Sequence, residues 1–174
     1  MLSAGISFIS LLDTDVLASY NYFSVGSLES VQLKELSVPC LTAIICTLIT
    51  VAISSKIDIM FLGDAVASSL GVRVKAVRLL CMILASTAAS SVVSFAGLLG
   101  FVGLVVPHIA RKIVGQRTLG LTISSALLGV IIVVAADTAG RTIFKPTEVP
   151  VGIMMSVIGA PFFLYLLLIK RGRR

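Results

Sequence analysis

The chain has 174 residues, of which 57% are hydrophobic and 13% charged, and its mean hydropathy is +1.11. Charged residues make up about a quarter of an ordinary soluble domain, so the composition excludes that class. The net charge of +6 does not indicate a nucleic-acid-binding protein, because the 14 lysines and arginines fall between hydrophobic segments and form no basic face with interleaved aromatics. We therefore expect an integral membrane protein, and the long continuous apolar segments predict spanning helices rather than a barrel.

The first segments predict a partial span and a surface loop. Residues 1–12 are apolar but shorter than the ~20 residues that a spanning helix needs, so we interpret them as the remnant of a span. Residues 13–36 mix charged residues with Tyr20, Tyr22 and Phe23, which is typical of the membrane interface. We expect a loop at the membrane surface here, with room for a helical part.

A full span and a structured connection follow. Residues 36–55 are uncharged and long enough for one crossing, whereas residues 56–78 carry four basic and two acidic residues. Two short helices broken at Gly63 and Gly71 fit the second segment, because glycine allows sharp reversals and Asp64 can lie in a first helical turn. Such a compact pair predicts a contact site for a partner, and a plain connector is the alternative.

The run of residues 79–110 is uncharged over 32 residues, which is too long for one span and short for two. We predict a tight reversal within residues 94–100, where glycine and serine cluster. The reversal leaves residues 77–93 as one span and residues 101–114 as a short span bent at Pro107.

Two further spans complete the predicted bundle. Residues 119–136 form an uncharged span, residues 137–148 a connection, and residues 149–169 the last span, which four basic residues follow. Eleven of the 14 basic residues lie in alternate connections and at the C-terminus, so we predict that this side is cytoplasmic.

Few residues suggest chemistry. Cys40, Cys46 and Cys81 lack CxxC spacing and the chain has one histidine, so we predict no metal site, no disulfide framework and no cofactor. No phosphate-binding G-x-x-x-x-G-K-[ST] loop occurs, which means that any ATP hydrolysis belongs to a partner. No nucleophile motif surrounds a serine, and His108 is expected to cap or pack at the end of its bent helix.

Asp137 is the ionisable residue nearest to the interior of a span, and we expect it at the outer interface. Arg141 follows four residues later, on the same face of a helix. Two interpretations are open: the two side chains form a local ion pair, or Arg141 receives an acidic residue of a protein partner.

Motifs in a fixed order give the chain a resemblance to the FecCD-type permeases of bacterial ABC importers, which take up iron-siderophore complexes, haem or cobalamin. The motifs are LGDAVASSLGV at 62–72, GFVGLVVPHIAR at 100–111, Ala-Asp at 136–137, EVPVG at 148–152 and IGAPFF at 158–163. The residues that carry the structural part of the resemblance are Gly100, Gly103, Pro107, His108, Arg111, Gly159 and Pro161.

The resemblance implies an all-α, polytopic transmembrane bundle in a bacterial cell membrane, with the C-terminus in the cytoplasm. It covers the C-terminal half of a ten-helix permease as one transmembrane region, residues 1–174, with about four full spans and a partial first one. The implied partners are two cytoplasmic ATPase subunits, an external substrate-binding protein and a second permease subunit. In this family the loop at about 56–78 docks on the ATPase, and the matching residues are Asp58, Leu62, Gly63, Asp64, Ala65, Leu70, Gly71 and Arg73. Arg141 and Glu148 match the docking side for the binding protein.

The length departs from the family, whose typical members are roughly twice as long. We therefore expect a split gene product, a truncated frame or a fragment that needs the missing N-terminal half and does not transport alone. Cargo uptake with only the ATPase and the binding protein added would contradict this expectation. The competing hypotheses are a non-energised helical membrane protein, such as a channel or assembly subunit, and an inactive permease fragment.

Overall fold

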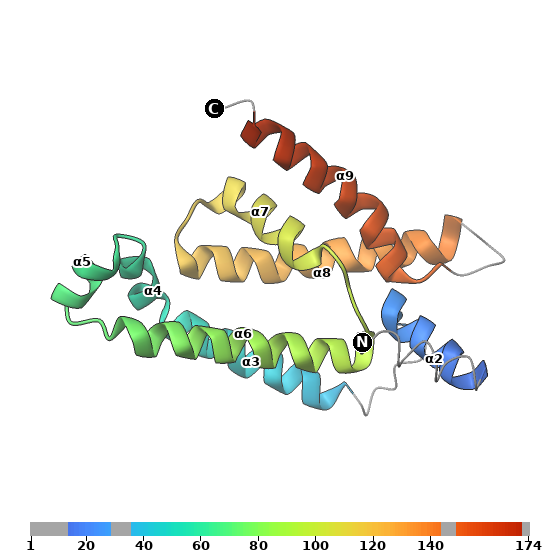
Figure 1. Ribbon diagram of the computed structural model, residues 1–174, viewed down its shortest axis with the longest axis horizontal. Helices are drawn as coiled ribbons and strands as arrows, with labels where there is room; N and C mark the ends of the chain where they lie inside the picture. Colours follow the sequence, from blue (N-terminus) through green and yellow to red (C-terminus); the bar gives the residue numbers. More distant parts are fainter. Residues whose placement is uncertain (1–13, 29–35, 144–148, 172–174) are drawn as a thin grey trace, which may run out of the picture.

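The computed structural model describes residues 14–28, 36–143 and 149–171, and all regular structure in these ranges is helical, as predicted. The labels follow Figure 1. The helices are α2 (Thr14–Val25), α3 (Ser37–Ala52), α4 (Ser54–Met60), α5 (Asp64–Ser69), α6 (Val74–Ala96), α7 (Val102–Val114), α8 (Thr118–Ile143) and α9 (Val151–Arg171).

The long helices form two packed pairs that lie side by side (Figure 1). Helix α3 packs along α6, α7 packs along α8, and α3 also contacts α8. Helix α9 crosses α7 and α8 obliquely, while α4 and α5 lie at one end of the molecule and α2 at the other (Figure 1). We call these ends the hairpin end and the α2 end.

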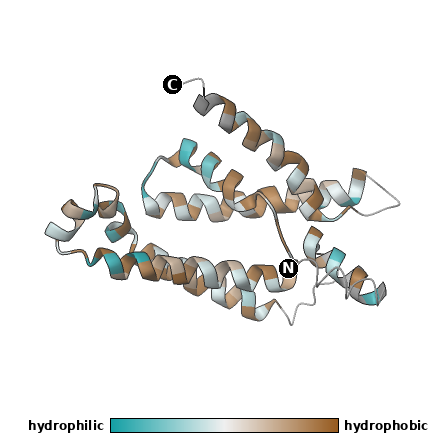
Figure 2. Ribbon diagram, in the orientation of Figure 1, coloured by the Kyte–Doolittle hydropathy of each residue, from teal (hydrophilic) through white to brown (hydrophobic). Residues whose placement is uncertain are grey.

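Two of the described helices, α6 and α8, are long and apolar enough to cross a membrane. Helices α3 and α4 make a third candidate if they are taken together, with a bend of 57° between them, and α9 contributes the shorter apolar segment Val151–Leu166. Hydrophobic residues predominate along the long helices and many are exposed, whereas hydrophilic residues are more frequent at the helix ends and α4 and α5 are mixed (Figure 2). This arrangement fits a multi-pass membrane protein.

The predicted reversal in the long uncharged run is confirmed. Helix α6 ends at Ala96, Gly97 has a φ of 70°, and α7 begins at Val102. The two helices run in opposite directions in Figure 1, joined by an extended segment. A positive φ suits glycine, which has no Cβ to clash with the backbone, so Gly97 is where the chain turns.

One predicted boundary is wrong. The sequence interpretation ended a span at residue 136 and placed Asp137 and Arg141 in a connection, whereas α8 continues to Ile143. The charged pair does not end the helix because the two side chains lie one turn apart and neutralise each other along its surface.

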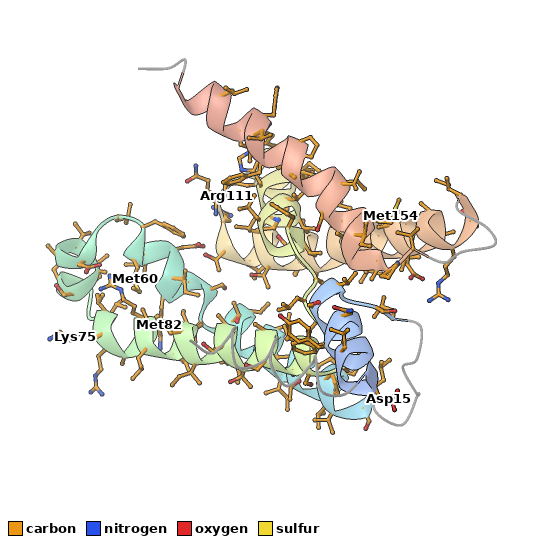
Figure 3. All side chains as sticks on the ribbon, turned by 45° about the vertical axis from the view of Figure 1, so that its right-hand side comes forward. Asp15, Met60, Lys75, Met82, Arg111 and Met154 are labelled. Carbon is orange, nitrogen blue, oxygen red and sulfur yellow. The ribbon has the colours of Figure 1, made fainter. Side chains whose placement is uncertain are left out.

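The buried core lies toward the α2 end, where α8 meets α9. Ala136, Val151 and Met155 form its centre, and Met154, which Figure 3 labels, packs against them. This core joins the two helices that precede and follow residues 144–148 in sequence.

Candidate functional site

The α4–α5 hairpin, residues 54–73, covers most of the predicted contact loop at about 56–78, and the structure confirms the two short helices predicted there. Gly63 separates α4 from α5 with a φ of 105°, and Gly71 ends the hairpin with a φ of 81°. A Cβ added to either glycine would meet no atom within 4 Å. The two glycines are therefore required for their backbone conformations and not for space.

The hairpin presents an apolar surface at the hairpin end of the molecule. Phe61 and Leu62 are 68% and 66% exposed, and Val66 and Leu70 are exposed beside them. The predicted contact residues that the structure leaves exposed are Leu62, Gly63, Asp64, Ala65, Leu70, Gly71 and Arg73. Sequence reasoning missed Phe61 and Val66, which continue the same surface. Exposed apolar residues outside the spanning helices are typical of a protein–protein contact.

An ion pair holds α5 against α6. The Arg78 guanidinium lies 2.9 Å from both carboxylate oxygens of Asp64, and both side chains are half exposed. Exposed pairs contribute at most about 1 kcal/mol to stability. The pair therefore orients the first turn of α5 more than it stabilises the fold.

Asp58 is partly buried and contacts α8 of the same chain. Its carboxylate accepts hydrogen bonds from the backbone N–H and the hydroxyl of Thr118, the first residue of α8, with the N–H donor at 2.8 Å. The sequence grouped Asp58 with the contact residues, and the structure gives its carboxylate an internal partner.

At the α2 end, Arg141 and Asp137 form the local ion pair that one sequence interpretation predicted. The Arg141 Nε lies 2.9 Å from a carboxylate oxygen of Asp137, and both side chains are partly exposed. Arg141 thus remains accessible at its surface while its orientation is set along α8. Glu148, which the sequence grouped with it, lies outside the described residues.

The motif residues of α7 and α9 hold these two helices together. The rings of His108 and Phe162 meet edge to face at 5.8 Å, which confirms that His108 packs within the bundle. Gly159 is buried against Phe101, directly before α7. Pro107 lies inside α7, which runs unbroken through it, and Pro161 lies inside α9.

The remaining motif residues surround this contact. Gly100 lies in the extended segment and Gly103 in the first turn of α7. Arg111 lies in the last turn of α7, beneath α9 in Figure 3. Within the described ranges, no group of three or more histidine, cysteine or acidic side chains could hold a metal ion.

A backbone junction, which the sequence did not reveal, ties α2 to the reversal and to α9. The Ser27 N–H donates to the Ala96 carbonyl (3.1 Å) and the Leu98 N–H to the Phe23 carbonyl (3.1 Å). The Gly152 N–H donates to the Gly26 carbonyl (3.2 Å). A Cβ at Gly97 would lie 2.5 Å from a backbone oxygen of α2, and at Gly152 it would come closer still. Glycine is required at both positions because the backbones touch there.

Comparison with known proteins places these features in context. The sequence model of the FecCD transport family matches residues 1–169. The Fe(3+)-citrate import system permease protein YfmE of Bacillus subtilis (strain 168) is 44% identical over 139 residues, covering 80% of this chain and 40% of that protein. The hemin transport system permease protein HmuU of Yersinia pestis is 33% identical over 162 residues, covering 93% of this chain and 48% of that protein.

A solved structure matches the fold as well. An inward-facing conformation of a metal-chelate type ABC transporter superposes with a TM-score of 0.86 at 27% identity, covering 95% of this chain and 54% of the other. The chain spans less than half the length of the curated relatives described above.

Proposed function

The chain belongs to the FecCD transport family, and on that premise we propose that it forms part of the membrane-spanning permease of an ATP-binding cassette importer. The proposed cargo is an iron-siderophore complex or a related metal chelate such as haem or cobalamin. The names of the relatives support this class, since they include permeases for ferric citrate, hemin and cobalamin. ATP hydrolysis in a partner subunit energises import, and the permease supplies no catalytic residue.

The proposed assembly contains the N-terminal half of the permease, a second permease subunit, two ATPase subunits and an external binding protein. The hairpin end and the C-terminus face the cytoplasm of a bacterial cell, because eleven of the 14 basic residues fall in the connections assigned to that side and at the C-terminus. At the opposite end, Arg141 docks an acidic residue of the binding protein, with Glu148 nearby in sequence.

The exposed apolar surface of the α4–α5 hairpin is the observation that carries the proposal. A connection between two spans has no need of Phe61, Leu62, Val66 and Leu70 on its outside, where water would contact them. A docked ATPase would remove that surface from water, and each large apolar side chain buried there stabilises the contact by about 1.5–3 kcal/mol.

Capture of the ATPase by the affinity-tagged, assembled permease tests this role. We expect Leu62→Asp and Arg73→Glu to reduce the amount of captured ATPase, by about tenfold for Leu62→Asp because a charge replaces a buried apolar contact. Lys112→Glu is the matched control for charge, since Lys112 is exposed at the end of α7 and lies outside the hairpin.

Asp64 needs a paired design, because its charge also holds α5 on α6. Asp64→Arg alone is expected to weaken capture, and the double variant Asp64→Arg with Arg78→Asp restores an ion pair of swapped sign. Undiminished capture by the Leu62 and Arg73 variants would contradict the docking role and favour a non-energised membrane protein.

A further inference from the structure

The side chain at the N-cap position of helix α8 cannot cap the helix. Arg117 occupies the N-cap position, because its carbonyl accepts the first helical hydrogen bond, from the Leu121 N–H at 2.9 Å. A guanidinium has no acceptor atom and therefore cannot satisfy the free N–H groups of the first turn. Helices usually carry serine, threonine, aspartate or asparagine at this position for that purpose.

Asp58 supplies the missing acceptor from α4, 60 positions earlier in the sequence. One carboxylate oxygen accepts from both the N–H and the hydroxyl of Thr118, and Thr118 is buried, with 9% of its surface exposed. A carboxylate at this place also complements the positive end of the α8 dipole. The arrangement is thus a capping interaction between two different elements.

The capping contact crosses a groove. A cavity of about 760 Å³ lies between α4 and the start of α8, with Ser55 and Phe61 on one wall and Gln116 and Leu119 on the other. The hydrogen bonds of Asp58 therefore connect α4 to the first residue of α8 beside this groove.

Helix α8 connects the two ends of the molecule. Its 26 residues span about 39 Å at 1.5 Å per residue, and its last turns carry Asp137 and Arg141. A displacement applied at Thr118 would therefore move the pair at the opposite end, since a helix transmits an axial displacement along its length.

We propose that Asp58 is a positioning residue, which, by capping α8 from the α4–α5 hairpin, couples movement of the hairpin to the α2 end of the molecule. This inference rests on the proposed function, in which the hairpin binds the ATPase and Arg141 binds the substrate-binding protein. Coupling of this kind is reciprocal, so occupation of either end alters the energetics of binding at the other.

The test uses the complete transporter in proteoliposomes, with both permease halves, the ATPase and the cognate binding protein. The readout is the ratio of the ATP hydrolysis rate with the binding protein to the rate without it. We expect Asp58→Ala, which removes both hydrogen bonds, to lower that ratio by about fivefold. Thr118→Val removes the hydroxyl donor and keeps the backbone N–H, so it should lower the ratio less. In both variants the amount of captured ATPase should stay at the wild-type level. Thr118→Ser keeps the hydroxyl donor and should retain the wild-type ratio.

Two comparisons separate coupling from general damage. Ser55→Ala removes a hydroxyl from the wall of the same groove and should leave the ratio unchanged. Thr118→Val is nearly isosteric, so it keeps the packing of the site and serves as the decisive variant if Asp58→Ala does not assemble. The double variant Asp58→Ala with Thr118→Val should be no worse than Asp58→Ala alone, because Asp58→Ala already removes the hydrogen bond that Thr118→Val breaks.

The outcomes that overturn the inference are distinct from failure of the proposed function. An unchanged ratio in Asp58→Ala, or in Thr118→Val where only that variant assembles, would show that the Asp58–Thr118 contact does not couple the ends. Additive losses in the double variant would show the same. If the wild-type assembly captures no ATPase at all, the proposed function itself fails, and the role of Asp58 fails with it.

Discussion

Phe101 and Gly159 show how a single side chain fixes the reversal between α6 and α7. Phe101 has a left-handed backbone conformation, with φ at 62°, which is uncommon for a bulky residue and is maintained by its surroundings. Its side chain fills the space above Gly159, where an added Cβ would clash with the Phe101 Cβ. Gly159 in α9 therefore leaves room for the side chain of Phe101, the residue directly before α7.

We expect Gly159→Ala to destabilise the protein by about 1–3 kcal/mol, because the new methyl group has no room against Phe101. The measurement is the midpoint of thermal unfolding of the purified protein in detergent. Gly103→Ala is the matched control, since a Cβ there meets no atom within 4 Å and alanine favours the helix.

Phe101→Gly in the Gly159→Ala background should recover part of the loss, because glycine removes the clashing Cβ and adopts a positive φ readily. Equal midpoints for Gly159→Ala and Gly103→Ala would contradict the account of this contact.

Single residues were predictable from sequence where their role is local. Gly63 and Gly71 were recognised as breaks because a reversal needs their backbone freedom, and His108 was expected to pack. The partner of Asp58 was missed because it lies 60 positions away and no short motif links the two. The left-handed conformation of Phe101 also depends on its neighbours in space and not on its neighbours in sequence.

At the scale of elements, α8 has separate contacts at its two ends. Asp58 caps its first residue, and the ion pair of Asp137 with Arg141 lies near its last turn. The position of this span was predicted correctly, but its end was placed too early, at residue 136, because the first charged residue was taken as the boundary. Hydropathy marks where charges lie, whereas the helix ends where its backbone hydrogen bonds end.

We expect Arg141→Glu to reduce capture of the binding protein by about tenfold or more, since like charges would then face each other across the contact. Capture of the ATPase should be unaffected, because the substitution lies at the opposite end of α8. Pull-down of each partner by the tagged transporter measures both effects.

Asp137→Ala is the control for the local pair, because it removes the partner carboxylate and keeps the Arg141 cation. Unchanged capture by Arg141→Glu would mean that Arg141 serves the local pair alone.

The packing of elements was the least predictable level of the fold. The number and order of the helices follow from apolar length and glycine positions, as the break of the long run into α6 and α7 illustrates. The backbone junction that joins α2, the reversal and α9 was not predicted, because small residues indicate close packing without indicating which helix is the partner.

At the scale of the whole molecule, charge and apolar surface are separated along the long axis. The hydrophilic residues concentrate at the helix ends, whereas the middle of the bundle is apolar, as a membrane requires (Figure 2). The exposed apolar residues of the α4–α5 hairpin depart from this pattern, since they lie among the polar residues of the hairpin end. That departure supports the proposal that this hairpin docks an ATPase.

Site-specific cross-linking in the assembled transporter tests the claim most directly. A photoreactive residue replaces either Leu62 in the hairpin or Val130 in α8, two apolar positions that are 66% and 64% exposed. The account predicts a cross-link to the ATP-hydrolysing subunit from position 62 and none from position 130. A co-purifying ATPase that cross-links from neither position, or equally from both, would contradict it.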